Sequence, residues 1–284
     1  MSIEAKNGNP RLALVIGSGS VKCAAALGLW KVLKREGIEL DMVVGCSGGS
    51  LYAAGIALGG DPQHFEEMTL NFWTNDLISG YASNLRAVMA REMRFDETSG
   101  LVDDEPVMER LQRAFGGRSF ADTDTPLYLV ATDFNSGDKV VMTEGALTDA
   151  IRASIAIPMI FPPWRVDGKL LTDGAVSDPL PVDVAIREGA QIILAMGFEL
   201  PYRKRMRSFN AVQSHLNAMY MNNILRATYA FYNAVHHQEI ISLWPDFDRA
   251  ISGFSTEQIP YIIEEGERTA EEHLPYLQRL LHEA

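Results

Sequence analysis

Cysteine is scarce in this sequence, and long apolar runs are absent. Cys23 and Cys46 are the only cysteines among the 284 residues, and neither has a histidine at metal-ligand spacing. We therefore predict two free thiols, with no disulfide framework, metal site or other cofactor. No run reaches the roughly 18 apolar residues of a transmembrane helix, and residues 1–10 lack the features of a secretory signal. These absences predict a cytoplasmic protein.

Basic residues are in the minority. The chain has 25 lysines and arginines against 37 aspartates and glutamates, which gives a formal net charge of −12. This balance excludes nucleic acid as the main partner, because binding to a phosphate backbone requires a basic face. Apolar residues make up 47% of the sequence, which is enough for a sizeable core.

The chain opens with apolar runs that alternate between strand and helix character. The order strand, helix, strand, helix is predicted over residues 11–16, 20–34, 41–45 and 50–58. This order is typical of a parallel sheet covered by helices, so we predict an α/β fold. Downstream we predict a helix over 61–72, a hairpin over 127–142, a helix over 148–157, a strand over 169–174, a helix and strand over 182–196, a helix over 208–237, a strand over 239–245 and a helix over 257–281.

No internal repeat or linker divides the chain, so we predict a single domain over residues 1–284. Its core would span about 11–198, and a C-terminal extension of helix and strand would span about 199–284. The periodic pattern weakens between residues 73 and 101, where methionines, aromatics and arginines are mixed. A mobile lid or cap is our hypothesis for that segment.

The sharpest motif is Gly45-Cys46-Ser47-Gly48-Gly49. It follows a predicted strand and precedes a predicted helix, which is the context of the G-x-S-x-G elbow of serine hydrolases. Such a turn needs glycine on both sides of the serine, here Gly45 and Gly49, because a Cβ would clash. It also presents the serine hydroxyl from a strained backbone. A glycine-rich turn with an incidental serine is the alternative, but the flanking elements favour Ser47 as a nucleophile.

A serine nucleophile needs a base that takes its proton. The histidines are His64, His215, His236, His237, His273 and His282. None lies in a short loop after a predicted strand, which disfavours a histidine triad. Asp173 ends a predicted apolar strand, where partial desolvation favours proton uptake, although it could instead cap its own turn. Asp133 also ends a strand, and we interpret it as a structural turn former.

The run Gly17-Ser18-Gly19-Ser20 lies between the first predicted strand and the first predicted helix. A dinucleotide-binding loop would have a third glycine where Lys22 stands, and no Gly-Lys-Ser/Thr follows at the spacing of a Walker loop. What remains is a set of backbone amides at a helix N-terminus beside a basic side chain, which is an anion site. The oxyanion of an acyl-transfer reaction is one such anion.

These motifs together resemble the bacterial patatin-like phospholipases. That family opens with a strand and a glycine-rich loop, G-G-G-G-x-[RK]-G, and continues with a G-x-S-x-G elbow and a later D-G-[GA] motif. The elbow is matched by residues 45–49, in which Cys46 and Gly48 take variable positions, and the last motif by Asp173-Gly174-Ala175. Residues 131–185 and 253–275 also look like the family, so the resemblance covers the chain from about Leu12 onward.

The resemblance implies a three-layer α/β/α fold around a mostly parallel sheet, and hydrolysis of carboxylic esters of lipids. It implies a dyad without histidine, in which Ser47 is the nucleophile and Asp173 the base that activates it and later activates water. The amides of Gly17, Ser18, Gly19 and Ser20 would then form the oxyanion hole.

The glycine-rich loop is the motif that departs most from the family. Ser18 and Ser20 replace two of its glycines and Cys23 replaces the last one. Serine resists a positive φ more than glycine does, so a loop that requires one would be distorted. Two alternatives therefore stay open: a catalytically weak acyl-binding or regulatory protein on the same fold, and an acyltransferase or thioesterase with the same dyad.

The predicted partner is a lipid or another carboxylic ester. Residues 203–207, Arg-Lys-Arg-Met-Arg, form the one dense basic cluster, and they precede a helix rich in methionine and tyrosine. Basic residues beside an amphipathic helix attract anionic lipid, which suggests a peripheral contact at the inner membrane surface. A solvated loop before a core helix is the alternative. Head group, acyl length and oligomeric state are not specified by the sequence.

Overall fold

The computed structural model describes residues 11–74, 77, 79–90, 94–202, 204–251 and 256–283. Arg203 of the basic cluster, six positions of the segment 73–101, and residues 253–255 of the family-like ending lie outside this part. The strands are β1 (Leu12–Ile16), β2 (Met42–Cys46), β3 (Leu127–Asp133), β4 (Lys139–Met142), β5 (Trp164–Val166), β6 (Lys169–Asp173), β7 (Ile192–Met196) and β8 (Glu239–Leu243). The α-helices are α1 (Ala25–Arg35), α2 (Gly48–Ala57), α3 (Pro62–Phe72), α4 (Tyr81–Met89), α5 (Glu105–Phe115), α6 (Leu147–Ser154), α7 (Val182–Arg187), α8 (Phe209–Val235) and α9 (Ile259–Glu283).

These strands form one sheet in the order β5-β6-β3-β2-β1-β7-β8, with β4 beside β3. The strands from β3 to β8 along this order are parallel, whereas β4, β5 and β6 run antiparallel to their neighbours. Strands β1, β2 and β7 are buried along their whole length and are almost entirely apolar. A strand covered on both faces requires this composition. The prediction of a mostly parallel sheet is confirmed.

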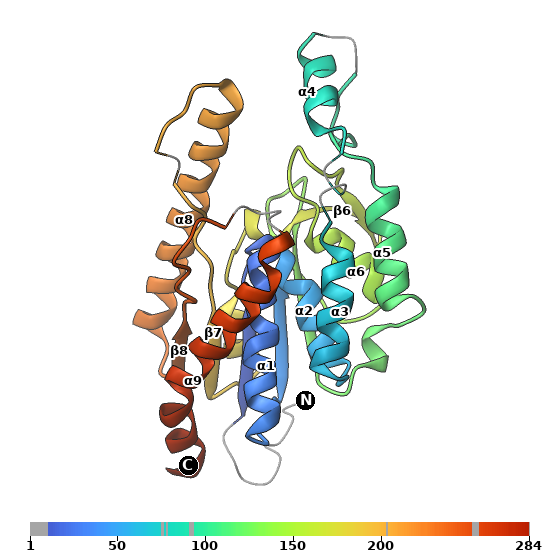
Figure 1. Cartoon of the computed structure of the whole chain (residues 1–284). Helices are drawn as coiled ribbons and strands as arrows, with labels where there is room; N and C mark the ends of the chain where they lie inside the picture. Colours follow the sequence, from blue (N-terminus) through green and yellow to red (C-terminus); the bar gives the residue numbers. More distant parts are fainter. Residues whose placement is uncertain are drawn as a thin grey trace.

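Helices cover both faces of the sheet (Figure 1). Leu14 and Ile16 of β1 belong to a core with side chains of α1, α2, α6 and α9, whereas Ala13 and Val15 belong to a second core with α7 and α8. Alternate residues of one strand therefore face different helical layers, as the pleat requires. The predicted three-layer α/β/α architecture is confirmed.

The C-terminal helix α9 packs on α1 at backbone contact. A Cβ on Gly28 of α1 would lie 2.1 Å from the carbonyl oxygen of Ile263, and one on Gly266 would lie 1.9 Å from that of Ala25. The two helices can approach this closely only because both positions are glycine. The C-terminal extension thus supplies a helix to the same core as the N-terminal strands.

Several local predictions differ from the structure. The helix expected over 20–34 begins with a 3₁₀ turn at Ser20–Ala24 before α1. The short strand β5 and the helix α5 were not predicted. The segment 73–101 contains α4, a helix with no buried side chain. Within the described part of the chain, no helix is both long and apolar enough to cross a membrane.

Candidate active site

Strands β2 and β6 meet end to end along one edge of β3. β2 pairs with β3 as far as Cys46 opposite Val130, and β6 pairs with β3 from Asp173 opposite Ala131. β4 occupies the other edge of the same part of β3, so β6 continues the edge that β2 leaves. The carboxyl ends of β2 and β6 therefore face each other. This arrangement brings Ser47, the residue after β2, against the last residue of β6.

The Ser47 hydroxyl donates a hydrogen bond to Oδ2 of Asp173 at 2.6 Å. Only 6% of Ser47 and 3% of Asp173 is exposed. Burial raises the pKa of Asp173 to about 6, because desolvation disfavours the carboxylate, and hydrogen bonds from Ser47 and from the Ala175 amide oppose this rise. At neutral pH the carboxylate is mostly ionised and oriented to accept the serine proton.

The Ser47 backbone is strained, with φ 54° and ψ −130°. A non-glycine residue at positive φ is uncommon and persists where surrounding contacts hold it. The Ser47 amide donates to Oγ of Ser154 at 2.9 Å, and the Ser154 hydroxyl donates to the Val130 carbonyl at 2.7 Å. The Ser47 carbonyl accepts from the Ser50 hydroxyl at 2.6 Å. Sequence reasoning missed Ser154, because nothing near the elbow in sequence points to α6.

The glycines of the elbow are required by close packing. A Cβ on Gly45 would lie 2.6 Å from the Cβ of Ala53, and one on Gly49 would lie 2.4 Å from the carbonyl oxygen of Ile16. Gly48 is as restricted, although its position was expected to be variable. A Cβ there would lie 2.7 to 2.9 Å from three backbone atoms of Ser20. The elbow and the loop at residues 17–20 therefore touch backbone to backbone.

Two amides of that loop are already engaged. The Gly17 amide donates to the Met196 carbonyl at 2.9 Å, and the Ser18 amide donates to the Pro179 carbonyl at 2.8 Å. The amides of Gly17 and Ser18, two of the four predicted oxyanion donors, therefore already have acceptors. In the part of the chain that the structure describes, the Gly19 amide donates to no backbone oxygen. The loop does adopt a positive φ at a serine, since φ of Ser20 is 53°.

The amide of Gly48 was not among the predicted donors. Gly48 is the first residue of α2, so its N–H has no acceptor within the helix. It follows Ser47 directly and lies at the positive end of the helix dipole. An elbow motif is itself a signal for this donor, because the amide after the nucleophile commonly contributes to an oxyanion hole.

Other polar residues named from the sequence have structural roles. Oδ1 of Asp133 accepts hydrogen bonds from the amides of Asn135 and Ser136, which confirms the turn-forming role. Cys23 and Cys46 are buried free thiols, and burial raises the pKa of each well above its ordinary value. Among the residues that the structure describes, the Ser47 and Asp173 side chains bond to each other and to the Ala175 amide, and to no histidine.

A narrow apolar pocket adjoins Ser47. Ser20, Ser47 and Gly48 form its polar end. The rest of its lining is apolar and comes from the end of α3 and the following segment, from α5 and from the turn after α6: Phe72, Trp73, Leu77, Val107, Ile155, Ile157 and Phe161. An apolar substituent of a carbonyl placed against the serine oxygen could therefore lie among these side chains.

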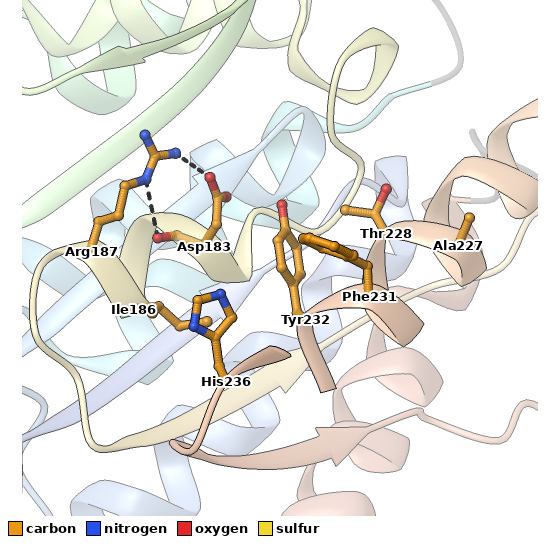
Figure 2. A pocket seen from close by; sticks show the side chains of 8 residues that line it. All are labelled: Asp183, Ile186, Arg187, Ala227, Thr228, Phe231, Tyr232 and His236. Atoms are coloured by element: carbon orange, nitrogen blue, oxygen red, sulfur yellow. Dashed lines mark hydrogen bonds and ion pairs between the residues drawn. The ribbon is translucent and has the colours of Figure 1, made fainter. Parts of the chain in front are cut away.

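A second, more open pocket lies between α7 and α8 (Figure 2). Asp183 and Arg187 form an ion pair there, and the rings of Phe231, Tyr232 and His236 line the α8 side. The pocket contains none of the residues predicted for the active site. Asp183 is paired with Arg187, and the Tyr232 hydroxyl donates to Asp178, which lies outside the pocket lining. We assign this pocket no role in the chemistry.

A family model described as patatin-like phospholipase matches residues 14–186. An uncharacterised NTE family protein of Mycobacterium tuberculosis is 27% identical over 225 residues, which cover 79% of this chain and 58% of that protein. The patatin-like phospholipase domain-containing protein 7 of Rattus norvegicus is 28% identical over 189 residues, which cover 65% of this chain and 13% of that protein. The chain thus spans little more than half the length of the mycobacterial relative.

Two solved structures share the fold. VipD from Legionella pneumophila matches with a TM-score of 0.52 and 15% identity, over 94% of this chain and 67% of that chain. Human GIVD cytosolic phospholipase A2, in complex with an inhibitor, matches with a TM-score of 0.51 and 11% identity, over 96% of this chain and 59% of that chain. At these identities the likeness concerns the fold alone.

Proposed function

The chain belongs to the patatin-like phospholipase family, and from this premise we propose that it is a serine hydrolase that cleaves carboxylic esters of lipids. The observation that carries the proposal is the 2.6 Å hydrogen bond from the Ser47 hydroxyl to Asp173 at a strained elbow. In this proposal Ser47 is the nucleophile and Asp173 is the general base.

In the first half of the reaction, Asp173 takes the hydroxyl proton while the Ser47 oxygen attacks the ester carbonyl. The tetrahedral intermediate collapses to an acyl-serine, and the protonated Asp173 returns its proton to the leaving alcohol. In the second half, Asp173 takes a proton from a water molecule that attacks the acyl-serine. When this second tetrahedral intermediate collapses, Asp173 returns the proton to the departing Ser47 oxygen, and the carboxylic acid is released. The raised pKa of Asp173, about 6, suits it to both roles, because it lies close to neutral pH.

The developing negative charge on the carbonyl oxygen needs donors that are fixed before the reaction. We propose the amides of Gly19 and Gly48 for this task. Both flank the place where the loop touches the elbow, and the amides of Gly17 and Ser18 are occupied by backbone carbonyls. The dipole of α2 adds to the stabilisation of an anion beside Gly48.

The acyl chain of the substrate is proposed to lie in the apolar pocket next to Ser47. Its lining by Phe72, Trp73 and Phe161 removes water from an alkyl group and leaves the ester carbonyl at the polar end. This arrangement favours a lipid acyl ester over a polar ester. The pocket is narrow, so we expect short acyl chains to react without any rearrangement of Trp73 and longer chains to require one.

The proposal is tested with a water-soluble chromogenic ester of a short fatty acid. We compare the unaltered chain with Ser47→Ala, Asp173→Asn and the matched control Asp133→Asn, which changes the other strand-end aspartate. Removing a nucleophile or its base costs on the order of a thousandfold or more in kcat. We expect that loss in the first two variants and near-normal rates in Asp133→Asn.

Equal rates in all four proteins would overturn the hydrolase proposal and favour an acyl-binding protein on the same fold. Product analysis with an added alcohol distinguishes an acyltransferase, because transfer would yield a new ester in place of the free acid.

A further inference from the structure

The N-terminal half of α8 carries an exposed apolar face. The helix packs on the second core through Leu225 and Tyr232, and Ala218 on the same side of the helix is buried. At 100° per residue, five large apolar side chains fall within one sector on the opposite side of the helix. Their exposed fractions range from 39% to 65%. These residues, which we term the α8 stripe, are Phe209, Val212, Leu216, Met219 and Tyr220.

The first 17 residues of α8, Phe209 to Leu225, lack the charged side chains of an ordinary solvent-facing helix. No Lys, Arg, Asp or Glu occurs from Phe209 to Leu225, and the first charged residue is Arg226. Contiguous exposed apolar surface on a soluble domain marks an interaction site. The stripe therefore has the properties of a binding surface.

A cationic cluster directly precedes the stripe. Lys204, Arg205 and Arg207 are all exposed, in a chain whose formal net charge is −12. Within the described ranges, none of the three forms an ion pair. Cations left unpaired beside an apolar helix face complement a surface that is both anionic and apolar beneath its charges.

The stripe and the cluster lie at the catalytic end of the sheet. β1 pairs in parallel with both β2 and β7, so the carboxyl ends of β2 and β7 point the same way. Ser47 follows β2, and the segment that leads to α8 follows β7. The upper part of α8 extends beyond this end of the sheet, and so does α4, which has no buried side chain (Figure 1).

We propose that the α8 stripe and the cluster of Lys204, Arg205 and Arg207 dock this chain on an anionic lipid surface, with the Ser47 end of the sheet turned toward the bilayer. Docking would bring the hydrolase of the proposed function to its lipid substrate, and this role rests on the proposed function. The docking surface itself does not depend on it. A second copy of this chain is the competing occupant, and the one-sign cluster of unpaired cations favours the lipid.

The test measures the fraction of protein that floats with lipid vesicles. One set of vesicles is phosphatidylcholine containing phosphatidylglycerol, and the other is phosphatidylcholine alone. All proteins carry Ser47→Ala, so that no lipid is hydrolysed. The charge variant is Lys204→Gln with Arg205→Gln and Arg207→Gln. Its matched control removes three exposed cations elsewhere: Lys34→Gln, Arg113→Gln and Arg118→Gln. The apolar variant is Leu216→Ser with Tyr220→Ser.

We expect the unmodified surface to bind the anionic vesicles and to bind the neutral ones weakly. Three removed charges should weaken binding to the anionic vesicles on the order of a hundredfold, whereas the matched control should stay close to the unmodified surface. The apolar variant should lose binding as well. Equal binding by all four proteins would overturn the proposal.

Two further measurements separate this proposal from neighbouring ones. With Ser47 restored, the charge and apolar variants should hydrolyse the water-soluble ester at normal rates, because no residue of the stripe or the cluster lines the pocket beside Ser47. If no protein hydrolyses that ester but the anionic vesicles are still bound selectively, the proposed function fails and the docking surface stands. A dimer in light scattering that Leu216→Ser with Tyr220→Ser dissociates, without vesicle binding, would assign the stripe to a second copy and overturn the proposal.

Discussion

Replacing Asp173 by asparagine should make the protein more stable while it removes activity. Asparagine has nearly the same shape, and its oxygen can still accept the hydrogen bond from the Ala175 amide, while its NH₂ group can donate to the Ser47 oxygen. What the substitution removes is a charge that is 97% shielded from solvent, since only 3% of Asp173 is exposed. The folded state of the variant therefore no longer bears the free-energy cost of burying a carboxylate.

The size of the effect follows from the pKa of Asp173, which is about 6 in the folded protein against an ordinary 3.8. Well below pH 4, the Asp173 carboxyl is protonated in both the folded and the unfolded state, and the penalty is absent. The penalty grows as the carboxyl ionises first in the unfolded state, and it is complete well above pH 6, where the carboxyl is ionised in both states. A difference of about two pKa units corresponds to about 3 kcal/mol at pH 8 and to about half of that at pH 5.

The assay is urea unfolding of the unaltered chain and Asp173→Asn at pH 8 and pH 5, followed by tryptophan fluorescence. Asp133→Asn serves as the matched control, because Asp133 also ends a strand but is only partly buried. We expect Asp173→Asn to unfold at higher urea at pH 8, with a smaller advantage at pH 5. An Asp173→Asn variant that is no more stable than the unaltered chain at pH 8, or whose advantage does not shrink at pH 5, would refute the reasoning.

Two more predictions concern the same site. Because Asp173 must be ionised to take the serine proton and its pKa is about 6, ester hydrolysis in a pH-stat should be half-maximal near pH 6 and fall about tenfold per pH unit well below it. A rate that is constant between pH 5 and pH 8 would contradict this assignment of the base. Gly48→Ala should lower kcat by tenfold or more and destabilise the fold by about 1–3 kcal/mol, because its Cβ would lie 2.7 Å from the Ser20 carbonyl oxygen and the backbone there cannot yield cheaply. Gly60→Ala is the control, since nothing lies within 4 Å of a Cβ there, and equal effects of the two substitutions on urea midpoint and kcat would argue against the packing explanation.

The parallel strands could be predicted because their signal is local. β1, β2 and β7 are continuous apolar runs, which a strand buried on both faces requires, and the turns and helices between them follow from glycine positions and apolar spacing. β5 could not be predicted, because it has three residues and, among the described strands, pairs with β6 alone. α4 was not predicted although Tyr81, Leu85 and Val88 stand at helical spacing, because the helix has only nine residues and lies between segments without a clear pattern.

The residues of the candidate site also divide into those that local sequence predicts and those that it does not. Ser47 was predictable from the elbow motif, since the strand, glycines and helix that define it are neighbours in sequence. Asp173 was one of two strand-end aspartates, and the resemblance to a family favoured it over Asp133. No local pattern predicted that Ser154 accepts a hydrogen bond from the Ser47 amide. Nor did any predict that two distant carbonyls accept the amides of Gly17 and Ser18.

The sequence alone determined the α/β class, the alternation of the buried parallel strands with helices and the presence of an elbow-like turn at Ser47, because each depends on residues within one or two helical turns of one another. The tertiary structure decided which groups meet. Ser47 and Asp173 are 126 positions apart, and they come within 2.6 Å because β2 and β6 share one edge of β3 end to end. Which loop amides can still bind an oxyanion was likewise decided by contacts with distant backbone, since a carbonyl from another segment can engage an amide that the local sequence leaves open.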